Sequence, residues 1–358
     1  MVDEYSVLGL MSGTSCDGLD IASCLFKQKN GSWNYSIDHA ATYPYPDGLQ
    51  EILKNVISLS AYDLAKLDME LGGFFAEKVK SFKNEYQINN IDFIASHGHT
   101  VFHQPKEQLT LQIGNGQAIF ENTQIPIINN FRVADVLKGG QGAPLVPAGD
   151  KILLSAYDFC LNLGGISNIS FDKENERIAF DIGPQNLGIN LIAQKKGLTM
   201  DKNGEIARKG RIQKELKDAL DAFDYYHKPS PKSLGIEDLQ DSFFPLLNKS
   251  IYSIEDTMHT LYHHLAEQIS KIIKTHALKK AKVLATGGGA HNLFFIELLQ
   301  QNAGEGIQII VPEKKLVDFK EALVFAFLGV LRVRKEVNVY RSVTGASQNS
   351  IAGVLYGF

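Results

Sequence analysis

Apolar and polar positions along the chain form two kinds of segment. Short apolar runs at residues 7–11 and 21–26 have the length and composition of buried strands, whereas residues 63–86 carry apolar side chains at helical spacing. Strand-like and helix-like segments follow each other through the rest of the chain without a low-complexity linker. This alternation predicts an α/β fold.

A glycine-rich polar loop separates the first two predicted strands. It consists of Gly13, Thr14, Ser15, Cys16, Asp17, Gly18, Leu19 and Asp20. Glycine lets the backbone approach a bound group, hydroxyls and loop amides donate to phosphate oxygens, and carboxylates position a metal or a water. The loop therefore predicts a nucleotide phosphate site, with a plain hairpin turn as the alternative.

Two more glycine turns follow predicted strands. The first, Gly164 and Gly165, joins two apolar runs and repeats the strand, turn and strand pattern of the N-terminus, which suggests a duplicated architecture. The second, Gly287, Gly288 and Gly289, lies between a predicted strand and a helix, where a phosphorylated ligand can approach the helix N-terminus. The sequence contains neither a P-loop nor a Rossmann motif, so those two nucleotide folds are not predicted.

Asp181 comes directly after a predicted strand at residues 176–180 and before a loop that contains glycine. Enzymes of the α/β class commonly hold catalytic groups at such strand ends. Asp181 is therefore the first candidate for a reactive residue. The alternative is a helix N-cap, because a helical segment begins near residue 187.

The domain organisation is predicted from a turn-rich stretch at residues 139–144, which is typical of a crossing between two lobes. We place the boundary near residue 130. The N-terminal lobe then covers residues 1–130, with a C-terminal segment of about 340–358 able to pack back on it, and the C-terminal lobe covers residues 131–339.

Composition narrows the class of protein. With 358 residues, 44% of them hydrophobic, and a net charge of −4, the chain is long enough for two domains with a core each. The 36 basic and 40 acidic residues form no long like-charge runs, so neither nucleic acid nor a membrane surface is an expected partner. The N-terminus lacks a basic region followed by an apolar stretch, and the 3 cysteines show no CxxC spacing, so a reducing, cytoplasmic location is expected.

Several sequence blocks, taken in order, resemble the anhydro-N-acetylmuramic acid kinase family of bacterial cell-wall recycling. Besides the first glycine loop, they are residues 96–103, 111–114, 131–132, 139–147, 162–169, 180–184, 231–233, 286–292, 321–322 and 342–346. The resemblance spans nearly the whole chain. It implies the two-lobed actin-like sugar kinase fold, in which duplicated ribonuclease-H-like lobes enclose an interlobe cleft for ATP.

The resemblance also implies a reaction. Water opens the 1,6-anhydro ring of the sugar, and the γ-phosphoryl group of ATP passes to the freed O6, giving N-acetylmuramic acid 6-phosphate. Asp181 would be the general base. The first glycine loop would bind the phosphates, with Mg²⁺ expected on them near Asp17. Gly164 and Gly165 would clamp the phosphates from the second lobe, and residues 287–289 with Asn292 would lie against the nucleoside.

For the sugar, the resemblance points to His97, Arg132 and Glu321. A guanidinium such as that of Arg132 can bind the lactyl carboxylate of a muramic sugar through two parallel hydrogen bonds. The alternatives are a salt bridge for Arg132 and a solvated helix face for Glu321. A metal site at His97, His99 and His103 is not favoured, because no cysteine or carboxylate joins them in sequence.

The chain departs from the family pattern at Gln185, where glycine is usual, and at Asn190, where aspartate is usual. Because a glycine position suggests positive φ, the loop after Asp181 is expected either to be strained or to run differently. Two other functions stay open: a related kinase acting on another sugar, and a non-catalytic ATP-binding interaction protein. A homodimer is expected from the resemblance and from the apolar helix at 323–330, unless that helix belongs to the core.

Overall fold

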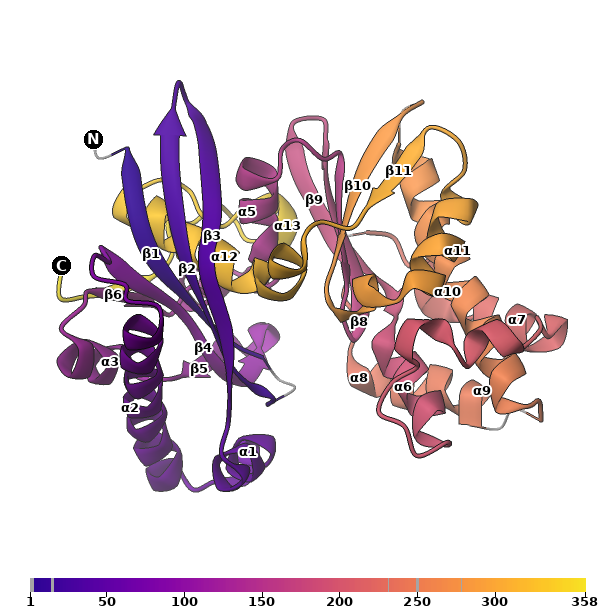
Figure 1. Ribbon diagram of the computed structural model, residues 1–358, viewed down its shortest axis with the longest axis horizontal. Helices are drawn as coiled ribbons and strands as arrows, with labels where there is room; N and C mark the ends of the chain where they lie inside the picture. Colours follow the sequence, from indigo (N-terminus) through magenta and orange to yellow (C-terminus); the bar gives the residue numbers. More distant parts are fainter. Residues whose placement is uncertain (1–2, 14–15, 231, 249–250, 278) are drawn as a thin grey trace. The chain divides into compact units, whose positions relative to one another are not determined.

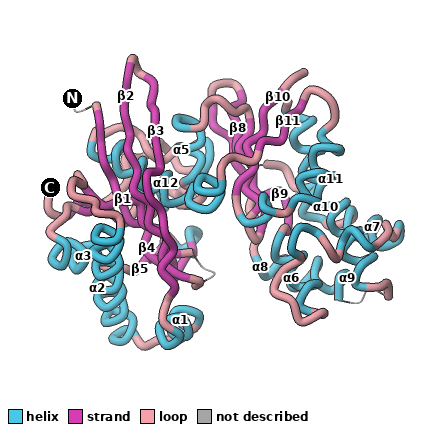
Figure 2. The backbone as a smooth tube through the Cα atoms, in the orientation of Figure 1, coloured by secondary structure: helices cyan, strands magenta, loops and turns pink. Residues whose placement is uncertain are grey.

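The computed structural model describes residues 3–13, 16–230, 232–248, 251–277 and 279–358. The chain forms two compact units, residues 1–153 with 319–358 and residues 154–318. This division differs from the boundary expected near residue 130, because helices α4 (Val133–Val136) and α5 (Val146–Leu153) still belong to the first unit. Figures 1 and 2 show that each unit has one sheet with helices around it.

The sheet of the first unit is built from strands of the first 129 residues and one strand near the C-terminus. Its strands are β1 (Glu4–Ser12), β2 (Gly18–Lys29), β3 (Ser32–Pro44), β4 (Phe93–Gln104), β5 (Leu109–Ile113), β6 (Ile127–Asn129) and β12 (Val354–Tyr356), in the order β12-β6-β4-β1-β2-β3, with β5 on β4. Strands β1, β4 and β6 run parallel, and β2 lies antiparallel between β1 and β3. Strand β12 pairs antiparallel with β6, so the C-terminal segment adds a strand to this sheet.

Helices cover both faces of this sheet. They are α1 (Asp47–Lys54), α2 (Ala61–Glu85), α3 (Gly116–Thr123), α4, α5, α12 (Lys314–Val333) and α13 (Arg341–Thr344). Because neighbouring side chains of a strand point to opposite faces, Leu8 and Leu10 join the cluster that includes Phe75 of α2, whereas Gly9 faces α12. A Cβ at Gly9 would lie 1.9 Å from the Ala322 carbonyl oxygen, so glycine lets α12, yellow in Figure 1, lie directly on the sheet.

The apolar segment at 323–330 lies within α12. All its side chains except glycine are buried, the larger ones at 2% exposure or less, so its assignment to the core is confirmed. None of the helices in the described ranges is long and apolar enough to cross a membrane.

The second unit repeats the strand pattern of the first. Its strands are β7 (Phe159–Leu163), β8 (Ile166–Lys173), β9 (Glu176–Pro184), β10 (Ala281–Thr286) and β11 (Ile307–Ile310), in the order β11-β10-β7-β8-β9. Its helices are α6 (Asn186–Gln194), α7 (Lys214–Asp221), α8 (Ile236–Asp238), α9 (Phe244–Asn248), α10 (Ile254–His276) and α11 (Leu293–Ala303). Strands β7, β10 and β11 run parallel, and β8 lies antiparallel between β7 and β9.

The order β11-β10-β7-β8-β9 corresponds strand for strand to β6-β4-β1-β2-β3 of the first unit, with the same directions. The predicted α/β fold with a duplicated architecture is therefore confirmed. Strand β3 is the element that the hydrophobic pattern missed. Along its 13 residues only Ile37 is buried, because β3 is an edge strand with one neighbour, so it lacks the apolar run that marks β1 and β2.

Candidate active site

Three predicted segments of the second unit meet at one edge of its sheet. Strands β7, β9 and β10 run in the same direction, so their C-terminal ends lie at the same edge. The Gly164 and Gly165 turn follows β7, Asp181 lies near the end of β9, and the glycine run at 287–289 follows β10. The tertiary fold thus brings together the residues that were predicted to contact phosphate and to act as a base.

The glycine turn after β7 is held by the first turn of α6. The Gly165 carbonyl accepts hydrogen bonds from the N–H groups of Gln185 at 2.9 Å and Leu187 at 3.1 Å. The Gly164 carbonyl accepts one from the Asn186 N–H at 3.1 Å. Because the carbonyls are held by the helix start, the turn has a defined position beside the end of β9.

The glycine run after β10 packs against the end of β7. Gly287 has φ of +80°, and a Cβ there would lie 2.5 Å from Asn162 Oδ1. A Cβ at Gly289 would lie 2.9 Å from the Leu163 Cβ. Gly288 is exposed, and only the Asn186 amide would lie within 4 Å of its Cβ, at 3.7 Å. Glycine is therefore needed for packing at 287 and 289, while Gly288 leaves open surface that a ligand can approach.

Asn292 has a structural function in this loop. Its side-chain oxygen accepts a hydrogen bond from the Phe295 N–H at 3.1 Å and caps α11. Its amide group donates to the Asp201 carbonyl at 3.1 Å and to the Tyr262 hydroxyl at 2.8 Å. Because both ends of the carboxamide are occupied, Asn292 contributes to the loop by fixing it at the start of the helix.

Asp181 lies at an irregularity of β9. The pairing of β8 with β9 shifts register there: Ser167 lies opposite Gly183 and Asn168 opposite Asp181, so that Ile182 is an extra residue. A bulge of this kind changes the direction of neighbouring side chains and is common next to active sites. The Asp181 N–H donates instead to the Lys232 carbonyl at 3.1 Å.

The Asp181 carboxylate is half-buried, and its two oxygens have different surroundings. Its Oδ2 accepts hydrogen bonds from the Leu234 N–H at 2.9 Å and the Ser233 hydroxyl at 3.3 Å. Among the described residues these are its hydrogen bonds, so Oδ1 is the oxygen available to a water. Burial raises the pKa of Asp181 above its ordinary 3.8, against the effect of these two donors. A carboxylate with a raised pKa is a stronger base than an exposed one.

The backbone conformation and the burial of Gln185 could not be read from the sequence. Its φ is −135°, so the positive φ suggested by the family's glycine does not occur, and no left-handed strain arises beside Asp181. The side chain has no exposed surface, and neither its amide oxygen nor its amide nitrogen has a hydrogen-bond partner among the described residues. Buried amides are normally paired, which makes this position a candidate for a ligand contact.

In the first unit, the glycine loop after β1 divides into two parts. Thr14 and Ser15 lie outside the described residues. The Cys16 N–H donates to the Gly13 carbonyl at 3.2 Å, and Cys16 takes a left-handed φ of 57°, which closes a tight turn. Asp17 is exposed beside it.

The second part of the loop belongs to the strand that follows. Gly18, Leu19 and Asp20 are the first residues of β2. Leu19 has no exposed surface, and a Cβ at Gly18 would lie 2.5 Å from the Tyr43 carbonyl oxygen. Asp20 accepts a hydrogen bond from the Thr42 hydroxyl at 2.5 Å. These contacts attach β2 to β3, so Gly13 and the exposed Asp17 are the described residues of the loop that a ligand can approach.

The base of this turn is fixed by buried polar contacts. The Ser12 hydroxyl lies 2.9 Å from His99 Nδ1 and accepts a hydrogen bond from the Tyr45 hydroxyl at 2.6 Å. Ser12 and His99 are both buried, and burial lowers the pKa of His99, so the neutral ring can pair with a hydroxyl. His99 thus holds Ser12, the residue that precedes the glycine loop, in a fixed position.

His97 and Arg132 contact each other in the same unit. Arg132 donates to His97 Nε2 from Nε at 3.0 Å and from Nη2 at 2.8 Å, and from Nη1 to the Gly142 carbonyl at 2.6 Å. Burial, and then the charge of Arg132, lower the pKa of His97 well below its ordinary value, so the ring is a neutral acceptor. Burial lowers the pKa of Arg132 to about 10, so the guanidinium stays charged at neutral pH.

Glu321 lies on α12 with an exposed side chain. Its negative charge raises the pKa of Arg132, against the larger effect of burial. Phe325, one helical turn later, packs on the His97 ring with 4.7 Å between ring centroids. The fold thus gathers His97, Arg132 and Glu321, which are far apart in sequence.

The residues present suit a phosphate-bound Mg²⁺ better than a metal held by protein alone. In the described ranges no three His, Cys, Asp or Glu side chains cluster as a metal site. Mg²⁺ is commonly bound through one or two carboxylates together with substrate phosphates. The exposed Asp17 beside a glycine turn provides such a carboxylate.

Two units with the same strand order and strand directions, each with glycine turns at strand ends, match the duplicated actin-like fold that the resemblance implies. Comparison with known proteins gives the family. Residues 5–357 match the model of the anhydro-N-acetylmuramic acid kinase family, and the chain belongs to this family. It is accordingly a kinase, a phosphotransferase with an alcohol group as acceptor.

Two named relatives illustrate the similarity. An anhydro-N-acetylmuramic acid kinase from Aliivibrio fischeri is 35% identical over 364 residues, covering 98% of each chain. One from Sulfurovum sp. is 33% identical over 369 residues, covering 99% of this chain and 100% of the relative. Among solved structures, the activator of 2-hydroxyisocaproyl-CoA dehydratase from Clostridium difficile with bound ADPNP aligns with a TM-score of 0.43 and 13% identity, over 93% of this chain and 98% of that one.

Proposed function

We propose that this kinase opens 1,6-anhydro-N-acetylmuramic acid with water and phosphorylates O6, with ATP as the phosphoryl donor, to give N-acetylmuramic acid 6-phosphate. The observation that carries the proposal is Asp181, a half-buried carboxylate of raised pKa, held beside two glycine turns by hydrogen bonds to one of its oxygens. Membership of the family supports the choice of sugar.

Asp181 is the general base in this proposal. As the water oxygen attacks C1, the C1–O6 bond breaks, O6 takes the γ-phosphoryl group, and ADP leaves. The proton released by the water goes to Asp181 Oδ1, the oxygen that accepts neither of the two protein hydrogen bonds. The raised pKa favours this transfer, because a base with a pKa nearer to neutrality accepts a proton more readily.

The glycine turns are assigned to the nucleotide. The backbone at residues 13–17 and the exposed Gly165 provide amides for phosphate oxygens, and the run at 287–289 provides open backbone for the nucleoside. Mg²⁺ would neutralise charge on the phosphates, and the exposed carboxylate of Asp17 would hold it on the protein side. Asn292 would act indirectly, by capping α11 and so fixing the loop that precedes this helix.

Arg132 is assigned to the carboxylate of the sugar. A guanidinium has five N–H donors, and the contacts with His97 and Gly142 use three of them. Within the described residues this leaves one N–H on each terminal nitrogen, the pair that can bind a carboxylate with two parallel bonds. His97 would orient the guanidinium, and the Glu321 carboxylate would accept hydrogen bonds from hydroxyls of the sugar.

The test is ATP turnover by the purified chain with a panel of anhydro and free amino sugars, with products identified by mass. The proposal expects a 6-phosphate from the anhydro sugar, with solvent oxygen incorporated at C1 when the water is isotopically labelled. Product from a different sugar alone would indicate a related kinase. ATP binding without sugar-dependent turnover would indicate an interaction protein on the same fold.

We also propose a cytoplasmic location and a homodimer. The three cysteines are buried and show no CxxC spacing, which supports a reducing compartment. Family membership supports the homodimer, whose interface must lie outside the buried segment at 323–330. Sedimentation analysis of the purified chain tests this state, and a monomer at micromolar concentration would contradict it.

A further inference from the structure

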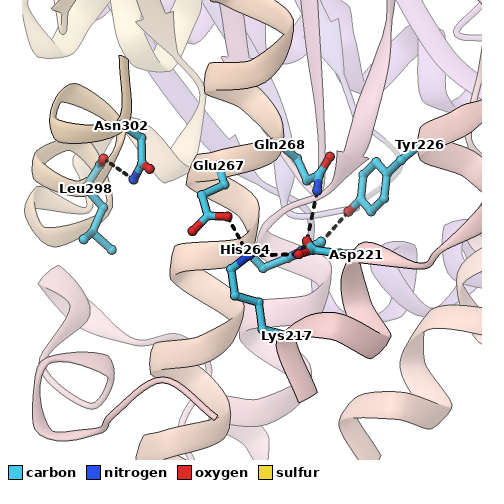
Figure 3. Close-up of polar contacts among 8 residues, drawn as sticks. All are labelled: Lys217, Asp221, Tyr226, His264, Glu267, Gln268, Leu298 and Asn302. Atoms are coloured by element: carbon cyan, nitrogen blue, oxygen red, sulfur yellow. Dashed lines mark hydrogen bonds and ion pairs between the residues drawn. The ribbon is translucent and has the colours of Figure 1, made fainter. Parts of the chain in front are cut away.

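A chain of buried polar contacts lies in the second unit, outside the predicted site. His264 of α10 has no exposed surface. Its Nδ1 lies 2.6 Å from Asp221 Oδ1, at the end of α7, and its Nε2 lies 2.9 Å from the Tyr226 hydroxyl, in the 3₁₀ turn Asp224–His227. Figure 3 shows Asp221 and Tyr226 on the side of His264 that faces away from Asn302.

The partners of His264 determine the direction of each hydrogen bond. A carboxylate only accepts, so Nδ1 carries the proton and donates to Asp221. Burial lowers the pKa of His264, and the neutral ring therefore accepts at Nε2 from the Tyr226 hydroxyl. The hydroxyl of Tyr226 is thus directed at His264.

Asp221 is held at the other end by further donors. It accepts hydrogen bonds from Lys217 Nζ at 2.8 Å and from Gln268 Nε2 at 3.0 Å. Lys217 also pairs with Glu267 at 2.6 Å. Burial acts to raise the pKa of Asp221, but the hydrogen bonds from His264 and Lys217 outweigh it and lower the pKa. The carboxylate is ionised at neutral pH and forms a fixed anchor for His264.

The other end of this chain of contacts reaches the C-terminal part of β9, which carries Asp181. A Cβ at Gly183 would lie 2.8 Å from Tyr226 Cε1 and 2.9 Å from its hydroxyl oxygen, so the tyrosine packs directly on the Gly183 backbone. The neighbouring Tyr225 donates its hydroxyl to the Asp181 carbonyl at 2.8 Å. Lys232 Nζ donates to the carbonyls of both tyrosines, at 2.9 Å and 3.4 Å.

We propose that Asp221, His264 and Tyr226 are positioning residues for Asp181. The bulge at Ile182 interrupts the pairing of β9 with β8 next to Asp181, whose N–H donates to the Lys232 carbonyl, so the position of the Asp181 carboxylate depends on the side chains that pack against this part of β9. Tyr226 packs on Gly183 in this part of β9. The hydrogen bond from its hydroxyl to His264, which Asp221 anchors, fixes the position of the ring. The inference rests on the proposed role of Asp181 as the base.

The main test is Tyr226→Phe, which keeps the ring on Gly183 and removes only the hydrogen bond to His264. We expect kcat for the anhydro sugar to fall roughly tenfold or more, with the KM for ATP within about twofold of the unchanged chain, because small displacements of a catalytic group slow the chemical step. The matched control is Tyr252→Phe, which removes a hydroxyl that donates to Glu215 at 3.1 Å on an exposed surface of the same unit.

Substitutions at His264 add a rescue experiment. In His264→Gln the side-chain amide can donate to Asp221 and its oxygen can accept from Tyr226, whereas His264→Leu can do neither. We expect the glutamine variant to retain a clearly higher kcat than the leucine variant. Equal kcat in the two variants would contradict a role for these hydrogen bonds.

The carboxyl carbon resonance of Asp181, assigned by its loss in Asp181→Asn, gives a readout that does not depend on turnover. We expect Tyr226→Phe to shift this resonance and Tyr252→Phe to leave it in place. If the two variants match each other in kcat and in this resonance, the inference fails. A chain without sugar-dependent turnover would overturn the proposed function, while the resonance would still decide whether Tyr226 positions Asp181.

Discussion

Arg132 donates to the ring nitrogen Nε2 of His97 from both Nε and Nη2, at 3.0 Å and 2.8 Å. Both residues were predicted separately to contact the sugar. Their mutual contact gives them different functions: His97 receives one edge of the guanidinium, and Nδ1 of its ring lies 2.9 Å from the Gly98 carbonyl. The orientation of Arg132 therefore depends on a neutral, anchored histidine.

This relationship predicts the effect of His97→Ala. Without the ring, Arg132 loses the acceptor that orients it, so we expect the KM for the anhydro sugar to rise roughly tenfold, which corresponds to the loss of about 1.4 kcal/mol of binding. The KM for ATP should not change. Steady-state kinetics checks both values, with His39→Ala of β3 as the control, and an unchanged sugar KM would contradict the orienting function.

The raised pKa of Asp181 predicts a pH dependence. A general base must be deprotonated, so kcat is expected to rise with pH through an apparent pKa above 3.8, the ordinary value for aspartate. Asp181→Asn should abolish turnover and leave ATP affinity nearly unchanged. The pH profile of kcat and equilibrium binding of ATP check these expectations. Full activity of Asp181→Asn would remove this residue from the reaction.

Gly287 and Gly304 form a matched pair for testing the third glycine run. Both have φ of +80°, but a Cβ at Gly287 would lie 2.5 Å from Asn162 Oδ1, whereas Gly304 has no atom within 4 Å. Alanine at either position costs about 1–2 kcal/mol of backbone strain. We expect only Gly287→Ala to weaken ATP binding as well, because the loop must move to relieve the contact.

Calorimetric titration with ATP and denaturant unfolding measure the two effects separately. Equal ATP affinity in Gly287→Ala and Gly304→Ala would contradict the assignment of this loop to the nucleotide. A loss of stability without a loss of ATP affinity in both variants would show that the run serves packing alone.

The unpaired amide of Gln185 predicts an uncommon response to an apolar substitution. Since neither polar atom has a protein partner in the described ranges, Gln185→Met should leave the free energy of unfolding unchanged or raise it by about 1 kcal/mol. If the amide contacts a substrate, the same variant should lose turnover. Unfolding by denaturant and sugar-dependent ATP turnover give the two results, and a clear loss of stability would show that the amide is paired.

Much of the fold could be predicted because its signals are local. Apolar runs marked β1, β2, β7 and β8, and glycines between them marked the turns. The edge strand β3 escaped because its side chains are mostly exposed, so the alternation that identifies a buried strand is weak. The observed division lies after residue 153 and not near residue 130, because α4 and α5 pack with the first unit. Such packing depends on tertiary contacts.

The sequence indicated individual residues of the candidate site, but it did not indicate the hydrogen bonds that join residues distant in the chain. Asp181 lies near the end of a strand and the glycine turns follow strands, so their place in the sequence indicates their place in the fold. His264 has no feature in the sequence that singles it out, and it is buried between Asp221 and Tyr226. Its partners lie 43 and 38 residues away, and no local pattern indicates such a contact.

The sequence by itself determined the strand and helix segments, the three glycine turns and the carboxylate at the end of β9, because each depends on residues that are neighbours in the chain. Only the tertiary structure decided which side chains share a hydrogen bond. It paired Arg132 with His97, left the Gln185 amide without a hydrogen-bond partner in the described part of the chain, and packed Tyr226 on Gly183. These relationships depend on strand order and helix packing, which join residues that are distant in sequence.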